Sequence, residues 1–465
     1  MKRLLVLSIV AFVLSVVGSG SLCAQTAAPV QAVKGPDERF KTDILVVVAH
    51  PDDEGGVTPY LARAIYDEHK RVAVVFATRG GSGGNDYSRE HGPALADIRE
   101  QEARAACAKL GITNVWFLEG KDTASQNVLN SLANWGHGAN LEALVRIVRL
   151  TRPEVIITWL PGIFIGENHG DHQAAGVLAT EAFDLANDPT AFPAQVAGAT
   201  RRLEVYLENL TPWQPKKLYF FSDAEDQKQF DGTGPAYSIK EISPSQKKSY
   251  WQLALEAAAP HLTQFPQAQE LQKMTDEQLK KFMEDPNNMF WPEPMTLTLG
   301  KEMPDAGAPL NRMERSFSRV PNVGVDRAMS ATLSLAGPWS YYERFCAAHQ
   351  LMKLPKGAVP EIAIKAGSSL MIPLVVDHPN SKALDVQVDV VLPDGWKLTR
   401  GSGKVRLPEE DRTDLSVEIA TPELSKEELK KSAATQEVVV RGSAARGPLG
   451  EVRLKVALRA SALAQ

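Results

Sequence analysis

The sequence predicts an α/β fold with a mostly parallel sheet and flanking helices, followed by a small antiparallel β-sandwich domain. Two patterns support this prediction. Between residues 44 and 159, short apolar and β-branched runs alternate with longer segments of helical spacing. Beyond residue 357, apolar and polar residues alternate with a period of two, which is typical of strands with one buried face. A chain of 465 residues has room for roughly two or three domains.

The first part of the chain contains four predicted strands and three predicted helices. The continuous apolar runs predict strands that are buried on both faces. Strands joined by helices imply crossover connections, and ligands of such sheets bind beyond the carboxyl ends of the strands. The predicted strands are residues 44–48, 71–77, 115–118 and 155–159, and the predicted helices are residues 57–69, 94–110 and 141–150.

The rest of the chain has a different texture. Residues 200–355 are rich in loops, and the charged stretch around 270–320 is expected to be an insertion or a lid over the core. Residues 357–465 are expected to form the sandwich, with the charged segment 426–431 as a loop between strands.

Composition excludes several classes of protein. The chain has 51 basic and 56 acidic residues, a net charge of −5, so we expect no nucleic-acid partner. Three cysteines cannot form a disulfide scaffold. Cys107 lies among alanines in a predicted helix, and we expect it to pack as a small core residue.

Residues 1–24 have the layout of a secretory signal peptide. Two basic residues precede an apolar run, and small residues lead to expected cleavage after Ala24. The run is shorter than the roughly 20 residues that span a membrane; a retained anchor and a lipid-modified Cys23 are the alternatives. We expect a periplasmic or extracellular protein with no transmembrane segment in the mature chain. Residues 25–40 are expected to be a flexible lead-in.

Two clusters of His and Asp residues follow the first and fourth predicted strands. Because the carboxyl ends of parallel strands meet at one edge of a sheet, both clusters are expected at the ligand-binding face. Imidazole and carboxylate are the usual ligands of a catalytic zinc ion, which needs three protein ligands and an open position for water. The clusters are His50-Pro51-Asp52-Asp53-Glu54 and Asn168-His169-Gly170-Asp171-His172.

The spacing of these residues suggests a division of roles. His50 and Asp53 can reach one ion while Asp52 points elsewhere, as the acceptor of a proton from water. His172 can supply the third ligand from the other cluster. His169 then remains available to donate a hydrogen bond to the oxygen that becomes negative in the tetrahedral intermediate. We expect one Zn²⁺ ion per chain, and other divalent metals stay open.

Each of these residues also has a structural interpretation. A single histidine near a strand end is usually solvated or capped, and Asp52 or Asp53 could simply cap the next helix. Asp171 could orient a histidine, as carboxylates behind metal ligands commonly do. The occurrence of both clusters at equivalent strand ends favours the metal site.

Together the two clusters resemble the motifs of the PIG-L/LmbE-like family of zinc-dependent N-deacetylases. The resemblance covers about residues 42–265, so we assign residues 41–356 to a deacetylase domain of this type, with the insertion around 270–320. Shorter stretches also resemble family motifs: Thr78-Arg79-Gly80-Gly81, Arg99 with Glu102, Asp122 after the third strand, and His261-Leu262-Thr263-Gln264.

The resemblance implies a Rossmann-like fold that hydrolyses a linear amide C–N bond, usually that of an acetylated amino sugar such as N-acetylglucosamine. Asp52 would be the general base. His169 would polarise the amide carbonyl or protonate the leaving amine, with support from Asp171. Arg99 would contact substrate; its alternative is a helix-surface ion pair with Glu102. The zinc ligands would be His50, Asp53 and His172.

The chain departs from the family pattern at two positions. Gly170 stands where many members have proline, and Glu167 stands where some have tyrosine. The role of that tyrosine as an extra hydrogen-bond donor to the oxyanion therefore cannot be assigned to a residue of this chain, and the resemblance does not identify the substrate. Leu392-Pro393-Asp394-Gly395-Trp396 resembles NEW3-type, Ig-like domains found beside carbohydrate-active enzymes. Trp396 could stack on a glycan, but packing in the core is the favoured interpretation.

The sequence therefore predicts an exported zinc-dependent hydrolase that removes an N-acetyl group from an amino sugar or glycoconjugate by metal-activated water. One alternative is a metal-dependent hydrolase of another bond, either a phosphoester or a different amide. The other is a sugar-binding module without turnover. The two-metal phosphoesterases usually need more ligands than these clusters supply.

Overall fold

The computed structural model describes residues 36–162, 169–198, 207–222, 234–284, 291–303, 331–351, 359–378, 383–409, 412–431, 433 and 435–460. Several predictions therefore lie outside the described residues. These are the signal peptide at 1–24, most of the lead-in at 25–40, Glu167 and Asn168 before the second motif, and parts of the 270–320 stretch.

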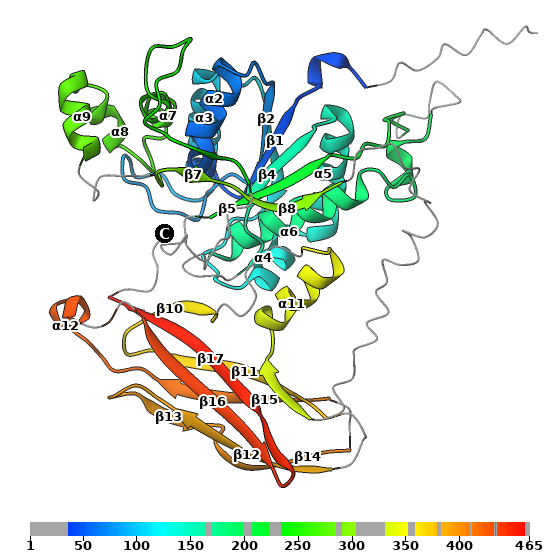
Figure 1. Ribbon diagram of the computed structural model, residues 1–465, viewed down its shortest axis with the longest axis vertical. Coiled ribbons are helices and arrows are strands. Elements are labelled where there is room, and N and C mark those ends of the chain that lie inside the picture. Colours follow the sequence, from blue (N-terminus) through cyan, green and yellow to red (C-terminus); the bar gives the residue numbers. More distant parts are fainter. Residues whose placement is uncertain are drawn as a thin grey trace, which may run out of the picture.

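The first part of the chain is built on a six-stranded sheet (Figure 1). Its first five strands in order of sequence are parallel, and β8 pairs antiparallel with β5 at one edge. Every residue of β1 and β2 is buried, as their continuous apolar sequences predict. The sheet order is β3 (Asn114–Gly120), β2 (Val72–Thr78), β1 (Ile44–Val48), β4 (Val155–Trp159), β5 (Lys217–Phe221) and β8 (Thr298–Glu302).

Helices cover both faces of this sheet (Figure 1). On one face, α2 (Thr58–Tyr66) and α3 (Pro93–Lys109) both pack against α7 (Tyr250–Ala258). On the other face, α4 (Val128–Trp135) and α5 (His137–Thr151) pack against α6 (Gly170–Leu185), which also contacts β4 and β1. The layered arrangement agrees with the predicted α/β class.

Two local predictions differ from the structure. Residues 128–135 form a helix that the sequence analysis did not predict, although Asn127 caps its start and Gly136 ends it in a left-handed conformation. The 270–320 stretch contributes β8 to the central sheet, so at least this part of it belongs to the core. Its remaining described elements are α8 (Gln267–Leu271), α9 (Asp276–Glu284) and β7 (Met295–Thr296), the last of which pairs with β6 (Ala236–Tyr237).

The C-terminal part consists of two further sheets, with α11 (Pro338–Ala348) between them and the helices of the first part (Figure 1). All their strand pairs are antiparallel except the pair of β10 and β17. β9 precedes the predicted boundary at residue 357 and still pairs with β11. The first of these sheets has the strand order β10 (Glu361–Lys365), β17 (Gly447–Arg459), β16 (Gln436–Ala444), β12 (Leu384–Val391) and β14 (Gly403–Leu407). The second has the order β13 (Lys397–Arg400), β15 (Arg412–Ala420), β11 (Ser369–Asp377) and β9 (Thr332–Leu335).

The predicted loop at 426–431 is wrong, because these residues form the helix α12 (Lys426–Lys431). Ser425 and Glu428 cap its start reciprocally: Ser425 N donates to Glu428 Oε2 at 2.8 Å, and Glu428 N donates to Ser425 Oγ at 3.3 Å. This capping box supplies partners for backbone N–H groups that a short helix leaves unpaired.

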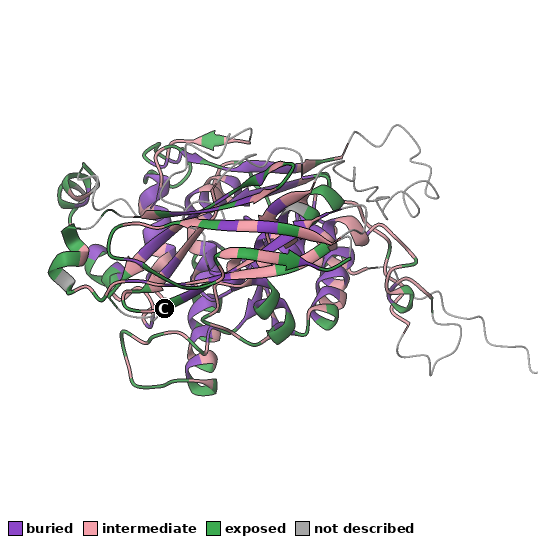
Figure 2. Cartoon of the chain, turned by 90° about the horizontal axis from the view of Figure 1, so that it is seen from below, coloured by how far each residue is buried: buried purple, intermediate pink, exposed green. Residues whose placement is uncertain are grey.

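A single cluster of buried apolar side chains runs from the parallel sheet through α11 into both C-terminal sheets. Figure 2 shows the buried residues inside these layers and the exposed residues on the outer helices and loops. Trp396 is 7% exposed and belongs to this core, in agreement with its favoured interpretation. Cys107 is buried and is a free thiol. None of the helices in the described residues is long and apolar enough to cross a membrane.

Candidate metal centre

The two predicted motifs meet at the carboxyl ends of β1 and β4, in the middle of the parallel sheet. β1 leads on to β2 on one side, and β4 leads on to β5 on the other. At such a switch point the connections leave in opposite directions and open a crevice for ligands. His50 comes two residues after β1, and His169 is the N-cap of α6 after β4. Asp171 and His172 thus lie in the first turn of a helix that the sequence analysis did not predict.

Asp53 contacts two imidazoles with one carboxylate oxygen. Its Oδ1 lies 3.5 Å from His50 Nδ1 and 3.3 Å from His172 Nε2. Tetrahedral zinc with bonds of about 2.0–2.1 Å places ligand atoms about 3.3–3.4 Å apart, so each of these two separations is compatible with ligands of one ion. Its Oδ2 accepts hydrogen bonds from Ala49 N and His50 N at 2.9 Å each and from Trp159 Nε1 at 2.8 Å. Burial opposes ionisation, but His172 and His50 hold the pKa of Asp53 well below its usual value.

The two ring nitrogens of His50 face different partners. Nδ1 faces Asp53, whereas Nε2 lies 3.2 Å from both Asp122 Oδ1 and Asp171 Oδ2. Because an ionised carboxylate only accepts, Nε2 carries a proton towards Asp122 and Asp171, and Nδ1 would be the nitrogen that binds a metal once its own proton is lost. Burial lowers the pKa of His50, but the three aspartates together raise it well above its usual value. The metal-free site therefore attracts positive charge.

Trp159 fixes the orientation of two of the expected ligands. Its indole stacks on the His172 ring, with centroids 4.1 Å apart and an interplanar angle of 2°. The same indole donates from Nε1 to Asp53. Trp159 is the last residue of β4, so a single strand end holds both side chains in place.

Asp52, the expected general base, has a strained backbone. Its φ of 100° and ψ of −22° lie in the left-handed region, which is uncommon for non-glycine residues. Its N–H donates to Glu54 Oε2 at 3.1 Å, and Glu54 Oε1 lies 2.7 Å from His261 Nε2. Burial, together with the charge of Asp53, raises the pKa of Asp52 to about 7. A base with such a pKa is well matched to neutral pH.

His169 lies beside the other two imidazoles, but its contacts suit a donor. Its ring centroid is 4.9 Å from that of His50 and 4.8 Å from that of His172. Ligand atoms of the three histidines lie within 4.8 Å of one another, so distance alone would admit His169 as a ligand. However, its Nδ1 accepts from Asp171 N at 3.2 Å, so Nε2 of the neutral ring carries the proton. Asp53 stays the expected third ligand, because one of its carboxylate oxygens contacts both His50 and His172.

Asp171 is fully buried and contacts His50 through its carboxylate, whereas its backbone N–H contacts His169. The carboxylate also accepts from Thr123 N and Thr123 Oγ1, each at 2.8 Å. Burial opposes ionisation, but His50 and the hydrogen bonds lower the pKa of Asp171. His50, Asp122 and Asp171 also lie close enough to hold an ion. Because Asp171 is already engaged by Thr123, this group is better suited to orient His50.

Arg99 lies in a different environment from the exposed ion pair that was its alternative. The side chain is buried and donates to Gly80 O and Gly84 O at 2.6 Å each. Glu102 accepts from Thr263 N at 3.0 Å and from Thr263 Oγ1 at 2.6 Å. Arg99 thus shapes the loop after β2, and its contact with substrate stays a prediction.

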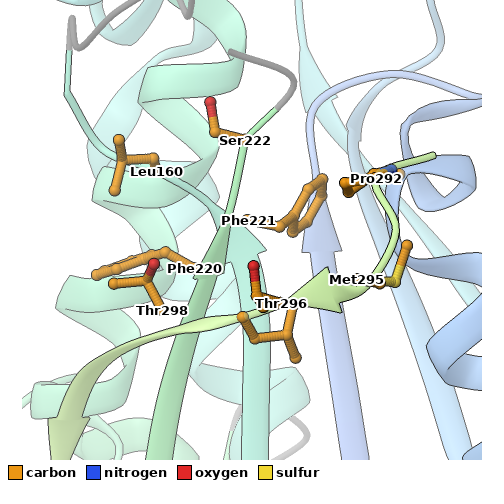
Figure 3. A pocket seen from close by; sticks show the side chains of 10 residues that line it. Leu160, Phe220, Phe221, Ser222, Pro292, Met295, Thr296 and Thr298 are labelled. Carbon is orange, nitrogen blue, oxygen red and sulfur yellow. The ribbon is translucent and has the colours of Figure 1, made fainter. Parts of the chain in front are cut away.

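The surroundings explain one departure from the family pattern and define the space nearby. A Cβ atom at Gly170 would lie 2.7 Å from both Ser125 O and Ser131 Oγ, so this position has no room for a side chain. At the carboxyl end of β5, a cavity of about 30 Å³ is lined by Phe221, Met295 and neighbouring residues (Figure 3). It has room for about two water molecules, too little for a sugar.

Sequence reasoning missed Trp159 and the roles of Asp122 and Glu54. Asp122 follows β3, so the rule that ligands bind at strand ends could have placed it in the site. Trp159 also ends a strand, but its role depends on a hydrogen bond to Asp53, 106 residues earlier, which the rule does not predict. The donor set, two imidazoles and a carboxylate with further carboxylates behind them, fits a divalent ion such as zinc.

Comparison with known proteins gives a family for this region. Residues 45–183 match the PIG-L family. The family is described as GlcNAc-PI de-N-acetylase, and the matched region includes all of β1 except Ile44, all of β4 and every residue of both motifs.

Two relatives are deacetylases of an acetamido sugar. The 1D-myo-inositol 2-acetamido-2-deoxy-alpha-D-glucopyranoside deacetylase 1 of Frankia alni is 35% identical over 188 residues, 37% of this chain and 59% of that protein. The deacetylase of the same name from Thermobifida fusca is 26% identical over 256 residues, 48% of this chain and 82% of that protein. The chain thus spans less than two thirds of the length of the Frankia relative.

Among solved structures, the chain is similar to the N,N'-diacetylchitobiose deacetylase from Pyrococcus horikoshii. The TM-score is 0.37 with 20% identity, and the match covers 58% of this chain and 88% of that chain.

Proposed function

We propose that this chain is an exported, zinc-dependent hydrolase that removes an N-acetyl group from an amino sugar or glycoconjugate. The observation that carries the proposal is that Asp53 Oδ1 lies 3.5 Å from His50 Nδ1 and 3.3 Å from His172 Nε2, with Asp52 next to Asp53 in the chain. The family match of residues 45–183 and the names of the two relatives support the reaction and the substrate class.

In this proposal, His50, Asp53 and His172 hold one zinc ion. When bound, the ion supplies Lewis acidity that polarises the amide carbonyl and lowers the pKa of water. Trp159 keeps Asp53 and His172 in position, and Asp122 and Asp171 keep the proton of His50 on Nε2.

The proton transfers fall to two other residues. Asp52 accepts a proton from the attacking water, a role supported by its raised pKa. His169 donates from Nε2 to the oxygen that becomes negative, or to the leaving amine, a role supported by the hydrogen bond that occupies its Nδ1. Asp171 supports His169 through its backbone N–H and His50 through its carboxylate.

Export and the C-terminal assignment belong to the proposal as well. A periplasmic or extracellular location rests on the signal-peptide layout of residues 1–24. A mature N-terminus at Gln25 is the expected finding by mass spectrometry of the exported protein, and an intact Met1 would contradict it. The two packed C-terminal sheets support an Ig-like sandwich. Its contact with a glycan would not use Trp396, which is buried.

The test measures acetate release from a panel of N-acetylated sugars. The mature chain is assayed as isolated, after chelation, and after zinc is added back. We expect release that chelation abolishes and zinc restores. Release that ignores chelation would contradict the metal assignment, and zinc binding without any release would favour the sugar-binding alternative.

Asp52→Asn separates catalysis from binding. We expect acetate release to fall by about 10²–10⁴-fold with zinc content unchanged, because only the base is lost. Asp389→Asn is the matched control, since Asp389 is exposed on β12 and is bonded to Gln387. If the Asp52→Asn chain releases acetate at the rate of the unmodified chain, Asp52 is not the general base.

A further inference from the structure

The loop of residues 121–127, between β3 and α4, contacts both motifs of the metal centre. Asp122 Oδ1 lies 3.2 Å from His50 Nε2. Thr123 donates to both oxygens of Asp171 at 2.8 Å. Ser125 O accepts from Gly170 N at 2.6 Å. The position of this loop therefore determines how the carboxylates meet His50.

Gln126, in the same loop, contacts a strand of the C-terminal sheets. Its Nε2 donates to Ala363 O at 2.6 Å, and Ala363 N donates to its Oε1 at 3.0 Å. Ala363 lies in β10, the edge strand that pairs with β17 on its other side. The Gln126 amide thus satisfies a donor and an acceptor on the outer edge of that sheet, where a neighbouring strand would otherwise pair.

A second contact joins the two parts of the molecule close to a metal ligand. Tyr342, on α11, donates from its hydroxyl to Gln173 Oε1. Gln173 directly follows His172 on α6, and both Tyr342 and Gln173 are buried. The C-terminal part is therefore bonded to each of the two segments that surround His50 and His172.

We propose that Gln126 is a positioning residue for the metal centre, and that the C-terminal sheets hold the 121–127 loop in place through it. Without the two bonds to Ala363, the loop would lose its anchor to β10. Asp122 and Thr123 would then sample other positions, and the carboxylates would no longer hold His50 in one orientation. The inference rests on the metal centre of the proposed function.

The test measures the affinity of the full mature chain for Co²⁺, together with the visible absorption of the bound ion. Gln126→Ala removes both bonds. Gln126→Glu keeps the volume and the acceptor but sets a carboxylate oxygen against Ala363 O. Gln387→Ala is the control, because Gln387 is a glutamine of the C-terminal sheets whose amide bonds to Asp389, away from this loop.

We expect both Gln126 variants to bind Co²⁺ about tenfold more weakly, the low end of the range for residues that orient metal ligands. The absorption band of bound Co²⁺ should change, and the control should match the unmodified chain. A Gln126→Ala chain that is less stable to heat but has unchanged Co²⁺ affinity and spectrum would overturn the inference alone. Failure of the unmodified chain to bind Co²⁺ would overturn the proposed metal centre as well.

Discussion

The metal centre and the surroundings of Arg149 both bury charged side chains, but they balance that charge differently. Arg149, on α5, is fully buried. Its guanidinium donates to Gln195 Oε1 at 2.9 Å and to a set of carbonyl oxygens at the end of α6 and in the following loop: Leu185, Ala186, Asp188, Ala191 and Phe192. At the metal centre, Asp53, Asp122 and Asp171 instead surround the single imidazole of His50.

The difference separates two uses of a buried charge. The cation of Arg149 is matched by neutral acceptors from one stretch of chain, so its hydrogen bonds are complete in the chain itself. The carboxylates of the metal centre repel one another, and a bound cation relieves this repulsion and stabilises them. Substitutions at the metal centre should therefore affect activity most, and substitutions at Arg149 should affect folding most.

The largest expected effect is at Asp53. Asp53→Asn preserves shape and the acceptor for the three N–H donors, but it removes the charge that holds the ion. We expect zinc content to fall to background and acetate release to drop by about 10³-fold or more. The unfolding free energy of the metal-free chain should fall as well, because His50 and His172 lose the ionised carboxylate whose pKa they hold low, but the loss of zinc is the larger effect. Zinc analysis and urea unfolding check this, with Asp385→Asn, exposed on β12, as the control.

Arg149→Met should have the opposite result, a loss of stability without a loss of zinc binding. It leaves several buried carbonyl oxygens without a donor, so we expect the unfolding free energy to fall by about 3–5 kcal/mol. Zinc bound per folded chain should stay the same. The control is Arg406→Met, since Arg406 is 66% exposed in its pair with Asp385, and should change stability by no more than about 0.5 kcal/mol. Equal losses of unfolding free energy in Arg149→Met and Arg406→Met would show that the buried arginine has no special role in folding.

A smaller effect comes from Asp67, a carboxylate at the end of α2 that is only half-buried. It accepts from Ser243 Oγ at 2.6 Å, Tyr250 Oη at 2.8 Å and Ser245 N at 3.0 Å. Burial opposes ionisation, but these hydrogen bonds lower the pKa of Asp67 to about 2. Because the folded pKa lies below the unfolded value, this stabilisation is present above about pH 4 and is lost as the pH falls towards 2.

The pH dependence of unfolding checks the assignment to Asp67. After allowance for screening by solvent, we expect a loss of about 1 kcal/mol between pH 4 and pH 2 that Asp67→Asn lacks. Asp377→Asn, in a strand of the C-terminal sheets, serves as the comparison. An identical pH profile for Asp67→Asn and the unmodified chain would show that the acid-sensitive stability comes from other groups.

The sequence was most informative where the pattern was local and repeated. The strands at 44–48 and 155–159 have the predicted bounds, because both runs are short and rich in β-branched residues, which favours a strand over a helix. The helical start of the second motif was missed, since His169-Gly170-Asp171-His172 contains residues of low helix propensity and an unusual histidine N-cap. Tertiary packing decides that segment.

The candidate site was predictable only in part for the same reason. The strand-end rule brings His50, Asp53 and His172 to one edge of the sheet, and the structure joins them by short contacts. The strand-end rule does not identify Trp159 as the residue that supports Asp53 and His172, or Gln126 as the link to β10. Those roles depend on partners 106 and 237 residues away, and no periodic pattern encodes such pairings.

The antiparallel edge strand β8 has a consequence for how the molecule assembles. It is the last strand of the central sheet in sequence, about 80 residues after β5, with which it pairs. Tyr342 and Ala363, which contact the segments around the metal ligands, come later still. Contacts between distant parts of a chain form slowly because a long loop must close first. We therefore expect metal loading to be a late event, completed after the final third of the chain has folded.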